Sequence, residues 1–202
     1  MNYLLIYLQS QRLLIKSSLV KKITVIDNFI PDIYFNKLTH LFNHNYLEGG
    51  DLFNWFWSGS SAYIDTPQAD DNFMFVHLLW DVKIGKTSNY FEMFEPLLYF
   101  IDKYSPVERI RRMKLNLYTN QNKKIIHRSH RDLIEENNTP IPNTTICIFN
   151  FTECNGGTII NNKEHPSKAN QAIIFSNDLF HQGYVQTDTP KRIVLNIATA
   201  NK

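Results

Sequence analysis

The chain has 202 residues, of which 43% are hydrophobic and 20% are charged. This length suits one domain with an apolar core, and the composition excludes a disordered or fibrous chain. A formal net charge of +2 is too small to indicate a nucleic-acid or membrane partner by itself. The two cysteines, Cys147 and Cys154, exclude a disulfide framework and a four-cysteine zinc site. We therefore expect a reducing, cytoplasmic compartment.

Residues 1–21 are interpreted as an appended N-terminal arm, followed by one domain over residues 22–202. The apolar run Tyr3 to Leu8 ends at Gln9, well short of the roughly 20 apolar residues that a bilayer span needs. No signal-peptide pattern is evident in the first 30 residues. The sequence thus predicts neither secretion nor a membrane partner.

Residues 22–107 are predicted to be a helical support region that opens with a strand at 23–26. A first helix is expected from Asp32 to about residue 45, with Pro31 as an acceptable helix-start residue. A second helix is predicted near 69–83. Its apolar residues, which recur at helical spacing, are Phe73, Val76, Trp80 and Ile84.

A third helix is predicted after Ser88, whose side chain can cap it. Pro96 falls inside this segment and should distort or split the helix, because proline lacks the amide donor. The expected buried stripe consists of Phe91, Phe94, Leu98 and Ile101.

Residues 108–202 are predicted to form an all-β half of the domain. Five short runs of strand character are separated by polar, proline or glycine turns: 109–118, 144–152, 157–160, 171–175 and 192–198. No amphipathic helix lies between these runs, so an antiparallel sandwich or barrel is favoured over a doubly wound parallel sheet. The expected fold class is therefore α+β and mainly β.

The candidate chemistry begins at His130, Arg131 and Asp132. In an extended chain, residues two apart point to the same side, so His130 and Asp132 can reach one metal ion. His181 follows an apolar strand and a turn, and closure of the sheet can bring it alongside. Two histidines and one carboxylate on one face of an octahedron suit Fe(II) and leave positions open. His127 is an alternative candidate for the first histidine ligand, but only His130 has an aspartate two residues later.

Arg192 lies on the last predicted strand. A guanidinium inside a barrel needs an anionic partner, and its planar fork matches a carboxylate. Arg192 therefore predicts a carboxylate ligand, whereas Lys191 should point to the opposite face.

The order of these motifs resembles the 2-oxoglutarate and iron(II) dependent oxygenases, particularly the prolyl-4-hydroxylase-like group. The shared features are Leu117-Tyr118, His130-Arg131-Asp132, Asn155-Gly156-Gly157-Thr158, Phe180-His181-Gln182-Gly183 and Lys191-Arg192-Ile193-Val194, with 23–29 resembling the domain start. The resemblance implies a double-stranded β-helix, or jelly roll, braced by N-terminal helices.

The same resemblance implies roles for individual residues. His130, Asp132 and His181 would be the iron ligands, and Arg192 and Tyr118 would bind the distal carboxylate of 2-oxoglutarate. Gly156 and Gly157 would form a structural turn into a core strand. Asn150 corresponds only loosely to a further cosubstrate contact, and neither it nor His127 is included in the expected site.

The sequence thus favours an Fe(II)- and 2-oxoglutarate-dependent dioxygenase that uses O2 and hydroxylates a substrate while forming succinate, with ascorbate as a candidate for keeping iron ferrous. The candidate substrates are a prolyl or other protein side chain or a small molecule, with nucleic acid less favoured. Two alternatives stay open: a cupin-type metal protein or non-oxygenase metalloenzyme, and a metal-free binding module. Neither the substrate nor the oligomeric state follows from the sequence.

Two further features bear on the substrate. Eight Lys or Arg residues occur between Arg109 and Arg131 without an acidic residue. They either attract an anionic substrate or, as we favour, occupy alternating solvated strand positions. Residues 46–68 and 133–143 are the expected specificity loops.

Overall fold

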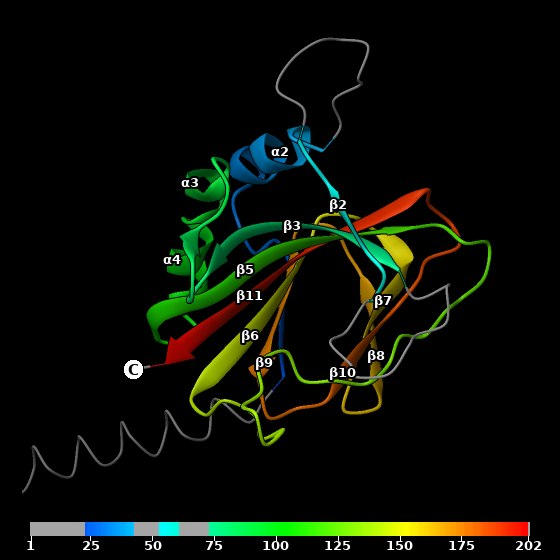
Figure 1. Ribbon diagram of the computed structural model, residues 1–202. Coiled ribbons are helices and arrows are strands. Elements are labelled where there is room, and N and C mark those ends of the chain that lie inside the picture. Colours follow the sequence, from blue (N-terminus) through cyan, green and yellow to red (C-terminus); the bar gives the residue numbers. More distant parts are fainter. Residues whose placement is uncertain (1–22, 43–52, 61–72, 202) are drawn as a thin grey trace, which may run out of the picture.

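The computed structural model describes residues 23–42, 53–60 and 73–201. Its core is two antiparallel sheets that face each other (Figure 1). The eight-stranded sheet contains β1 (Thr24–Ile26), β2 (Phe56–Ser58), β3 (Met74–Asp81), β4 (Gly85–Lys86), β5 (Val107–Thr119), β6 (Thr144–Asn150), β9 (Gln171–Ser176) and β11 (Lys191–Asn201). The three-stranded sheet contains β7 (Cys154–Ile160), β8 (Lys163–Ser167) and β10 (His181–Tyr184).

Strand order in the large sheet is β1-β9-β6-β11-β5-β3-β2, with β4 paired to β3, and the small sheet runs β10-β7-β8. The chain passes from β6 to β7 in the small sheet and from β8 back to β9 in the large sheet, so the connections cross between sheets as in a jelly roll. Every pairing is antiparallel. The predicted mainly β architecture is confirmed, and the short strands β8 and β10 add to the five predicted runs.

Three helices cover the outer face of the large sheet: α2 (Asp32–His40), α3 (Phe91–Phe94) and α4 (Leu97–Asp102) (Figure 1). Pro31 stands at the start of α2, as expected, and the helix ends at His40 rather than near residue 45. Pro96 divides the third predicted helix into α3 and α4, and the Ser88 hydroxyl accepts a hydrogen bond from the Tyr90 amide just before α3. The expected arm at 1–21 lies outside the described residues.

The helix predicted near 69–83 is wrong, because Met74–Asp81 forms strand β3. This strand has the large sheet's helix layer on one face and the barrel interior on the other, so apolar residues occupy both faces instead of alternating. A register shift between Leu78 and Trp80 further disturbs the two-residue alternation of side chains that is typical of a strand. The helical spacing of Phe73, Val76 and Trp80 is therefore a coincidence within a nearly continuous apolar run.

The two faces of the large sheet bury different kinds of side chain. Toward the helices, Leu115 of β5 and Leu195 of β11 pair with each other and join the larger apolar core. Toward the small sheet, the alternate positions carry polar groups, among which Asn116 and Arg192 are buried. The helix side therefore supplies most of the apolar burial that stabilises the fold, and the barrel side holds the polar site.

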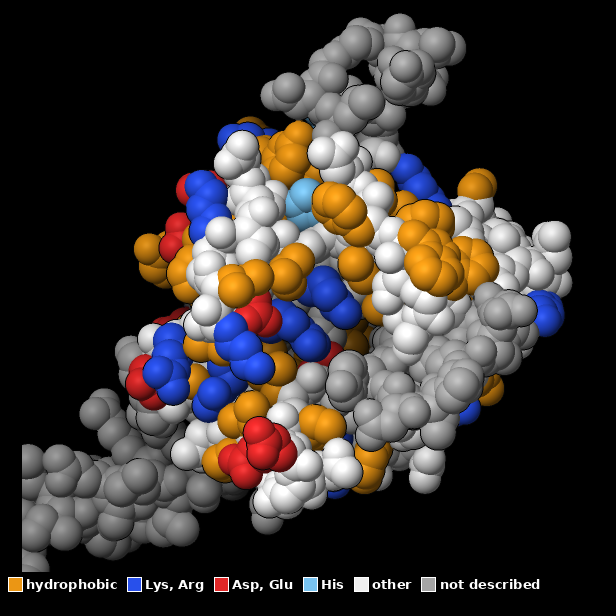
Figure 2. Space-filling model, in the orientation of Figure 1, with side chains coloured by type: hydrophobic (Ala, Val, Ile, Leu, Met, Phe, Trp, Pro, Cys, Tyr) orange, Lys and Arg blue, Asp and Glu red, His pale blue; other side chains and the backbone are white. Residues whose placement is uncertain are grey.

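The basic residues between Arg109 and Arg131 do not all occupy a solvated face. Arg109, Lys123, Lys124 and Arg128 are exposed, but Arg112 has only 19% of its side chain accessible. In Figure 2, Lys and Arg side chains gather in and beside a hollow over β5 and β11. The prediction that these basic residues occupy solvated strand positions is therefore wrong for Arg112, on the face of β5 that points into the barrel.

No helix among the described residues is long and apolar enough to cross a membrane.

The helix-side core predicts a strong contrast between two isoleucines. Ile197 on β11 is 1% exposed and Ile33 on α2 is 84% exposed. Because a buried truncation leaves a cavity, Ile197→Ala should lower the free energy of unfolding by about 2–5 kcal/mol. Ile33→Ala should change it by less than about 0.5 kcal/mol. Urea titration followed by circular dichroism measures both, and equal midpoints for the two variants would contradict this assignment of the core.

Candidate metal centre and cosubstrate pocket

The segment before Asp132 runs beside β10 and extends the small sheet irregularly. His130 and His181 exchange both backbone hydrogen bonds, at 2.9 and 3.0 Å. Earlier in the segment, the His127 amide donates to the Gly183 carbonyl. This pairing brings the two histidines opposite each other, with ring centroids 4.5 Å apart.

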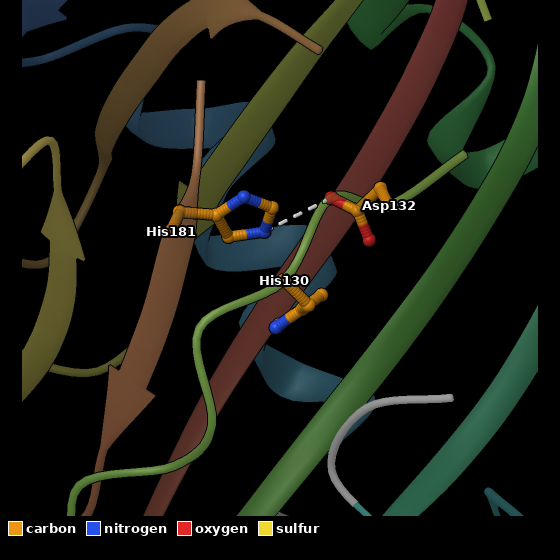
Figure 3. A group of neighbouring side chains, drawn as sticks. All are labelled: His130, Asp132 and His181. Carbon is orange, nitrogen blue, oxygen red and sulfur yellow. Dashed lines mark ion pairs between the residues drawn. The ribbon is translucent and has the colours of Figure 1, made fainter. Parts of the chain in front are cut away.

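The three predicted ligands are neighbouring side chains (Figure 3). One candidate ligand atom from each of His130, Asp132 and His181 lies within 4.8 Å of the others. His181 Nε2 lies 3.1 Å from Asp132 Oδ2, and Figure 3 shows this pair directed toward each other. Two imidazoles and a carboxylate at this spacing form a donor set suited to a divalent transition metal.

The tautomer of His130 suits a ligand. Its Nδ1 lies 3.0 Å from the Arg128 carbonyl oxygen, which can only accept, so Nδ1 carries the proton and Nε2 has a free lone pair. Burial and the neighbouring His181 lower the pKa of His130. The imidazole is therefore neutral near pH 7, the form that coordinates metals.

Asp132 is held as a carboxylate by donors on both oxygens. Arg112 pairs with Oδ1, and Asn196 Nδ2 donates to Oδ2 at 2.9 Å. Burial alone would raise the pKa of Asp132, but His181 and Arg112 beside it hold that pKa well below its ordinary value. Arg112 thus pairs with Oδ1, and Oδ2 is the oxygen that lies beside His181 Nε2.

A buried asparagine fixes the chain just after Asp132. Asn177 is 1% exposed, and its side chain accepts from the Leu133 amide at 3.2 Å and donates to the Leu133 carbonyl at 2.6 Å. Asn177 lies in the turn between β9 and β10, four residues before His181. One turn thus positions both the aspartate and the second histidine.

Arg192 is a buried cation with no carboxylate partner among the described residues. It is 1% exposed, and among the described residues its guanidinium donates hydrogen bonds to the Tyr184 carbonyl at 3.4 Å and Thr158 Oγ1 at 3.3 Å and lies over the Tyr118 ring. Its Nε has no hydrogen-bond partner in the part of the chain that the structure describes. Burial lowers the pKa of Arg192, as expected for a cation that lacks an anion. The side chain therefore fits an anionic ligand with a carboxylate at this end of the barrel.

Tyr118 lies directly opposite Arg192 across the β5–β11 ladder. It is 7% exposed, and burial raises the pKa of its hydroxyl, which therefore stays protonated. A protonated phenol beside a guanidinium gives two kinds of donor for one carboxylate.

The candidate ligands, Arg192 and Tyr118 all line one cavity between the two sheets. Four polar residues that also line it were not among the predicted site residues: Lys114, Asn116, Thr158 and Asn196. Lys114, Asn116 and Tyr118 are spaced by two along β5, and Arg192, Val194 and Asn196 by two along β11. This period of two, applied to the strands flanking Arg192, is the signal that could have found them.

Lys114 is half-buried at the metal end of this cavity. Burial and the neighbouring Arg112 lower the pKa of Lys114 to about 8. Its strand partner on β11 is Asn196, which binds Asp132. Lys114 is thus a second cation in the cavity, separate from Arg192.

The residues left out of the expected site have distinct places. His127 is buried and lines the cavity beside Tyr118, but it is not part of the three-residue cluster. Asn150 is 1% exposed on β6, and neither of its amide atoms has a hydrogen-bond partner within the described chain. A Cβ on Gly157 would lie 2.3 Å from the His165 carbonyl oxygen, so close packing against β8 requires glycine there.

No protein-family model and no curated protein matches this sequence. Solved structures do share its fold, and they confirm the resemblance to 2-oxoglutarate and iron(II) oxygenases at the level of the fold. A 2OG-Fe(II) oxygenase family oxidoreductase from Burkholderia pseudomallei has a TM-score of 0.60 at 9% identity, covering 89% of this chain and 88% of its own. A Pseudomonas putida prolyl-4-hydroxylase has a TM-score of 0.57 at 12% identity, covering 90% and 94%.

The shared fold accommodates more than one reaction. The non-heme alpha-ketoglutarate-dependent epimerase SnoN from nogalamycin biosynthesis has a TM-score of 0.59 at 10% identity and covers 95% of this chain and 82% of its own. Identities this low establish a common fold but not a common substrate. The function must therefore be argued from the site.

The contacts of Asp132 predict a supporting role for Asn196. Removing its amide should leave Asp132 Oδ2 less well oriented and lower the affinity for a divalent metal by about 10–100-fold, as for other residues that orient metal ligands. Calorimetric titration of Asn196→Ala with Mn(II) measures this loss. Asn201→Ala, at the far end of the same strand, is the matched control. Unchanged Mn(II) affinity in Asn196→Ala would refute the role.

Proposed function

We propose that this protein is an Fe(II)- and 2-oxoglutarate-dependent dioxygenase that hydroxylates its substrate. The observation that carries the proposal is that one cavity holds both the His130, Asp132 and His181 cluster and a buried arginine, Arg192, for which the described residues supply no carboxylate partner. A cupin-type metal protein would need the first feature but gives no reason for the second. The shared fold supports the same class.

The protein's own groups would divide the work. His130 Nε2, Asp132 Oδ2 and His181 Nε2 would hold Fe(II), while Arg112 and Asn196 fix the carboxylate. Arg192 and Tyr118 would bind the distal carboxylate of 2-oxoglutarate and so direct its keto acid end toward the metal. With iron bound, the site would support oxidation by O2: 2-oxoglutarate would be converted to succinate and CO2, with one oxygen atom of O2 entering succinate and the other a C–H bond of the substrate.

Enclosure by the two sheets serves this chemistry. The cavity walls include the apolar side chains of Ile148 and Val194 as well as the polar groups. Water is thereby limited near the metal ligands, which strengthens the electrostatic interactions of Arg192 and protects a reactive centre from side reactions.

The central test uses the full chain with Fe(II), ascorbate and 2-oxoglutarate. We expect slow formation of succinate even without substrate, detected by NMR, and an absorption band of the anaerobic iron and 2-oxoglutarate complex. His130→Ala and Asp132→Ala should abolish both signals, because each removes a metal ligand. A protein that binds Fe(II) but neither binds nor consumes 2-oxoglutarate would instead be the cupin-type alternative.

A second prediction concerns the cosubstrate contacts. Tyr118→Phe removes one hydroxyl donor to a carboxylate, an interaction that contributes about 1.5–3 kcal/mol. We therefore expect the Kd for 2-oxoglutarate to rise about tenfold or more. Arg192→Lys keeps the charge but loses the bidentate fork, and it should weaken binding at least tenfold.

Calorimetry on the Mn(II)-loaded protein measures both Kd values, and Mn(II) affinity itself serves as the control. It should stay unchanged, because neither residue touches the three ligands. If both variants bind 2-oxoglutarate as tightly as the parent protein, the cosubstrate does not occupy the Arg192 end of the cavity.

The same reaction can be used to find the substrate that is hydroxylated. Incubating cell extract with the enzyme, Fe(II) and 2-oxoglutarate, and searching by mass spectrometry for products that gain one oxygen atom, would identify it.

A further inference from the structure

Lys114 is placed at the metal end of the cavity by the register of the large sheet. It pairs with Asn196 of β11 on one side and Leu78 of β3 on the other. Its side chain shares the barrel face with Asn116 and Tyr118, since each lies two residues further along β5. It lines the same cavity as His130, Asp132 and His181.

The distal carboxylate proposed for 2-oxoglutarate is out of the reach of Lys114. Tyr118 pairs with Arg192, whereas Lys114 pairs with Asn196, four residues away on both strands. At about 3.3 Å per residue this separates the two cationic ends by about 13 Å. Lys114 therefore belongs to a different part of the cavity, beside the groups that hold Asp132.

No protein anion is left for Lys114 within the described chain. Asp132 is the only carboxylate among the residues that line the cavity, and Arg112, Asn196 and His181 already contact it. None of the ion pairs among the described residues includes Lys114. A half-buried ammonium group without a counter-ion is costly unless a ligand supplies the charge.

Binding of metal and cosubstrate does not remove this excess. Arg112 would neutralise Asp132, and Arg192 would neutralise the distal carboxylate of 2-oxoglutarate. The two positive charges of a divalent cation would then be opposed by only one negative charge, that of the other carboxylate of 2-oxoglutarate. The metal end of the cavity thus keeps a net positive charge before Lys114 is counted.

We propose that Lys114 binds an anionic group of the substrate, a carboxylate or a phosphate, close to the carbon that is hydroxylated. This inference rests on the proposed function and narrows it to substrates that carry a carboxylate or a phosphate. An ammonium group on a strand of the rigid sheet is a point charge that fixes the substrate's orientation relative to the metal ligands.

The test uses the full chain loaded with Mn(II) and saturating 2-oxoglutarate, so that Arg192 is already occupied. Calorimetric titration with inorganic phosphate and, separately, with acetate probes the two kinds of anion. We expect at least one probe to bind, and Lys114→Met to weaken it at least tenfold. Lys114→Arg should retain binding within a fewfold.

Lys83→Met is the matched control, because Lys83 lies exposed in the turn between β3 and β4 and should leave binding unchanged. Thermal melting of each variant verifies that the fold is retained. Equal binding of both probes by Lys114→Met and the parent protein would overturn the proposal.

Two other outcomes are also decisive. If Lys114→Met weakens 2-oxoglutarate itself and not the added anion, Lys114 is a cosubstrate contact and the proposal fails. If the parent protein binds Mn(II) but no 2-oxoglutarate, the proposed function fails first. A hydroxylated species in cell extract that carries neither a carboxylate nor a phosphate would likewise contradict the role of Lys114.

Discussion

The candidate site depends on the pair of backbone hydrogen bonds between His130 and His181. They join an irregular segment after β5 to the first residue of β10, and the chain is held again by Asn177 immediately afterwards. Without this pairing, the histidine and aspartate two positions apart would still share a face, but His181 would have no fixed relation to them. Convergence of the three side chains is thus set by main-chain geometry before any metal binds.

The large sheet separates stability from chemistry by using its two faces differently. Leu115 and Leu195 pack under the helices, while the alternate residues Lys114 and Asn196 face the barrel. Burying Arg192 without an anion costs free energy, which the apolar burial on the helix side can offset. Such a cost is typical of binding sites, where a ligand completes interactions that the protein leaves open.

The sequence predicted those parts of the site that local spacing determines. His130 and Asp132 lie two apart in an extended chain, and Arg192 is a charge within an apolar strand, so each carried a recognisable signal. Lys114 and Arg112 did not, because alternation of charged and apolar residues on a strand is also the pattern of a solvated face. Only the pairing of β5 with β11 shows that this polar face points inward.

The error in β3 has a related cause. A strand buried on both faces loses the alternation that distinguishes strand from helix, and the register shift after Leu78 removes what remains. β3 was therefore harder to predict than β6, β9 and β11, which carry apolar runs between clear turns.

The distribution of charge along β5 links the fold to specificity. Similar folds include prolyl hydroxylases and an epimerase, so the common architecture leaves the substrate open. In this chain the Arg192 end and the Lys114 end are both cationic, with the three candidate metal ligands in the same cavity. A cosubstrate with two carboxylates can satisfy the first end and the metal together, but it has no third anion for Lys114. The Lys114 ammonium group would then select among substrates. It lies on a core strand, whose position varies far less than that of a surface loop.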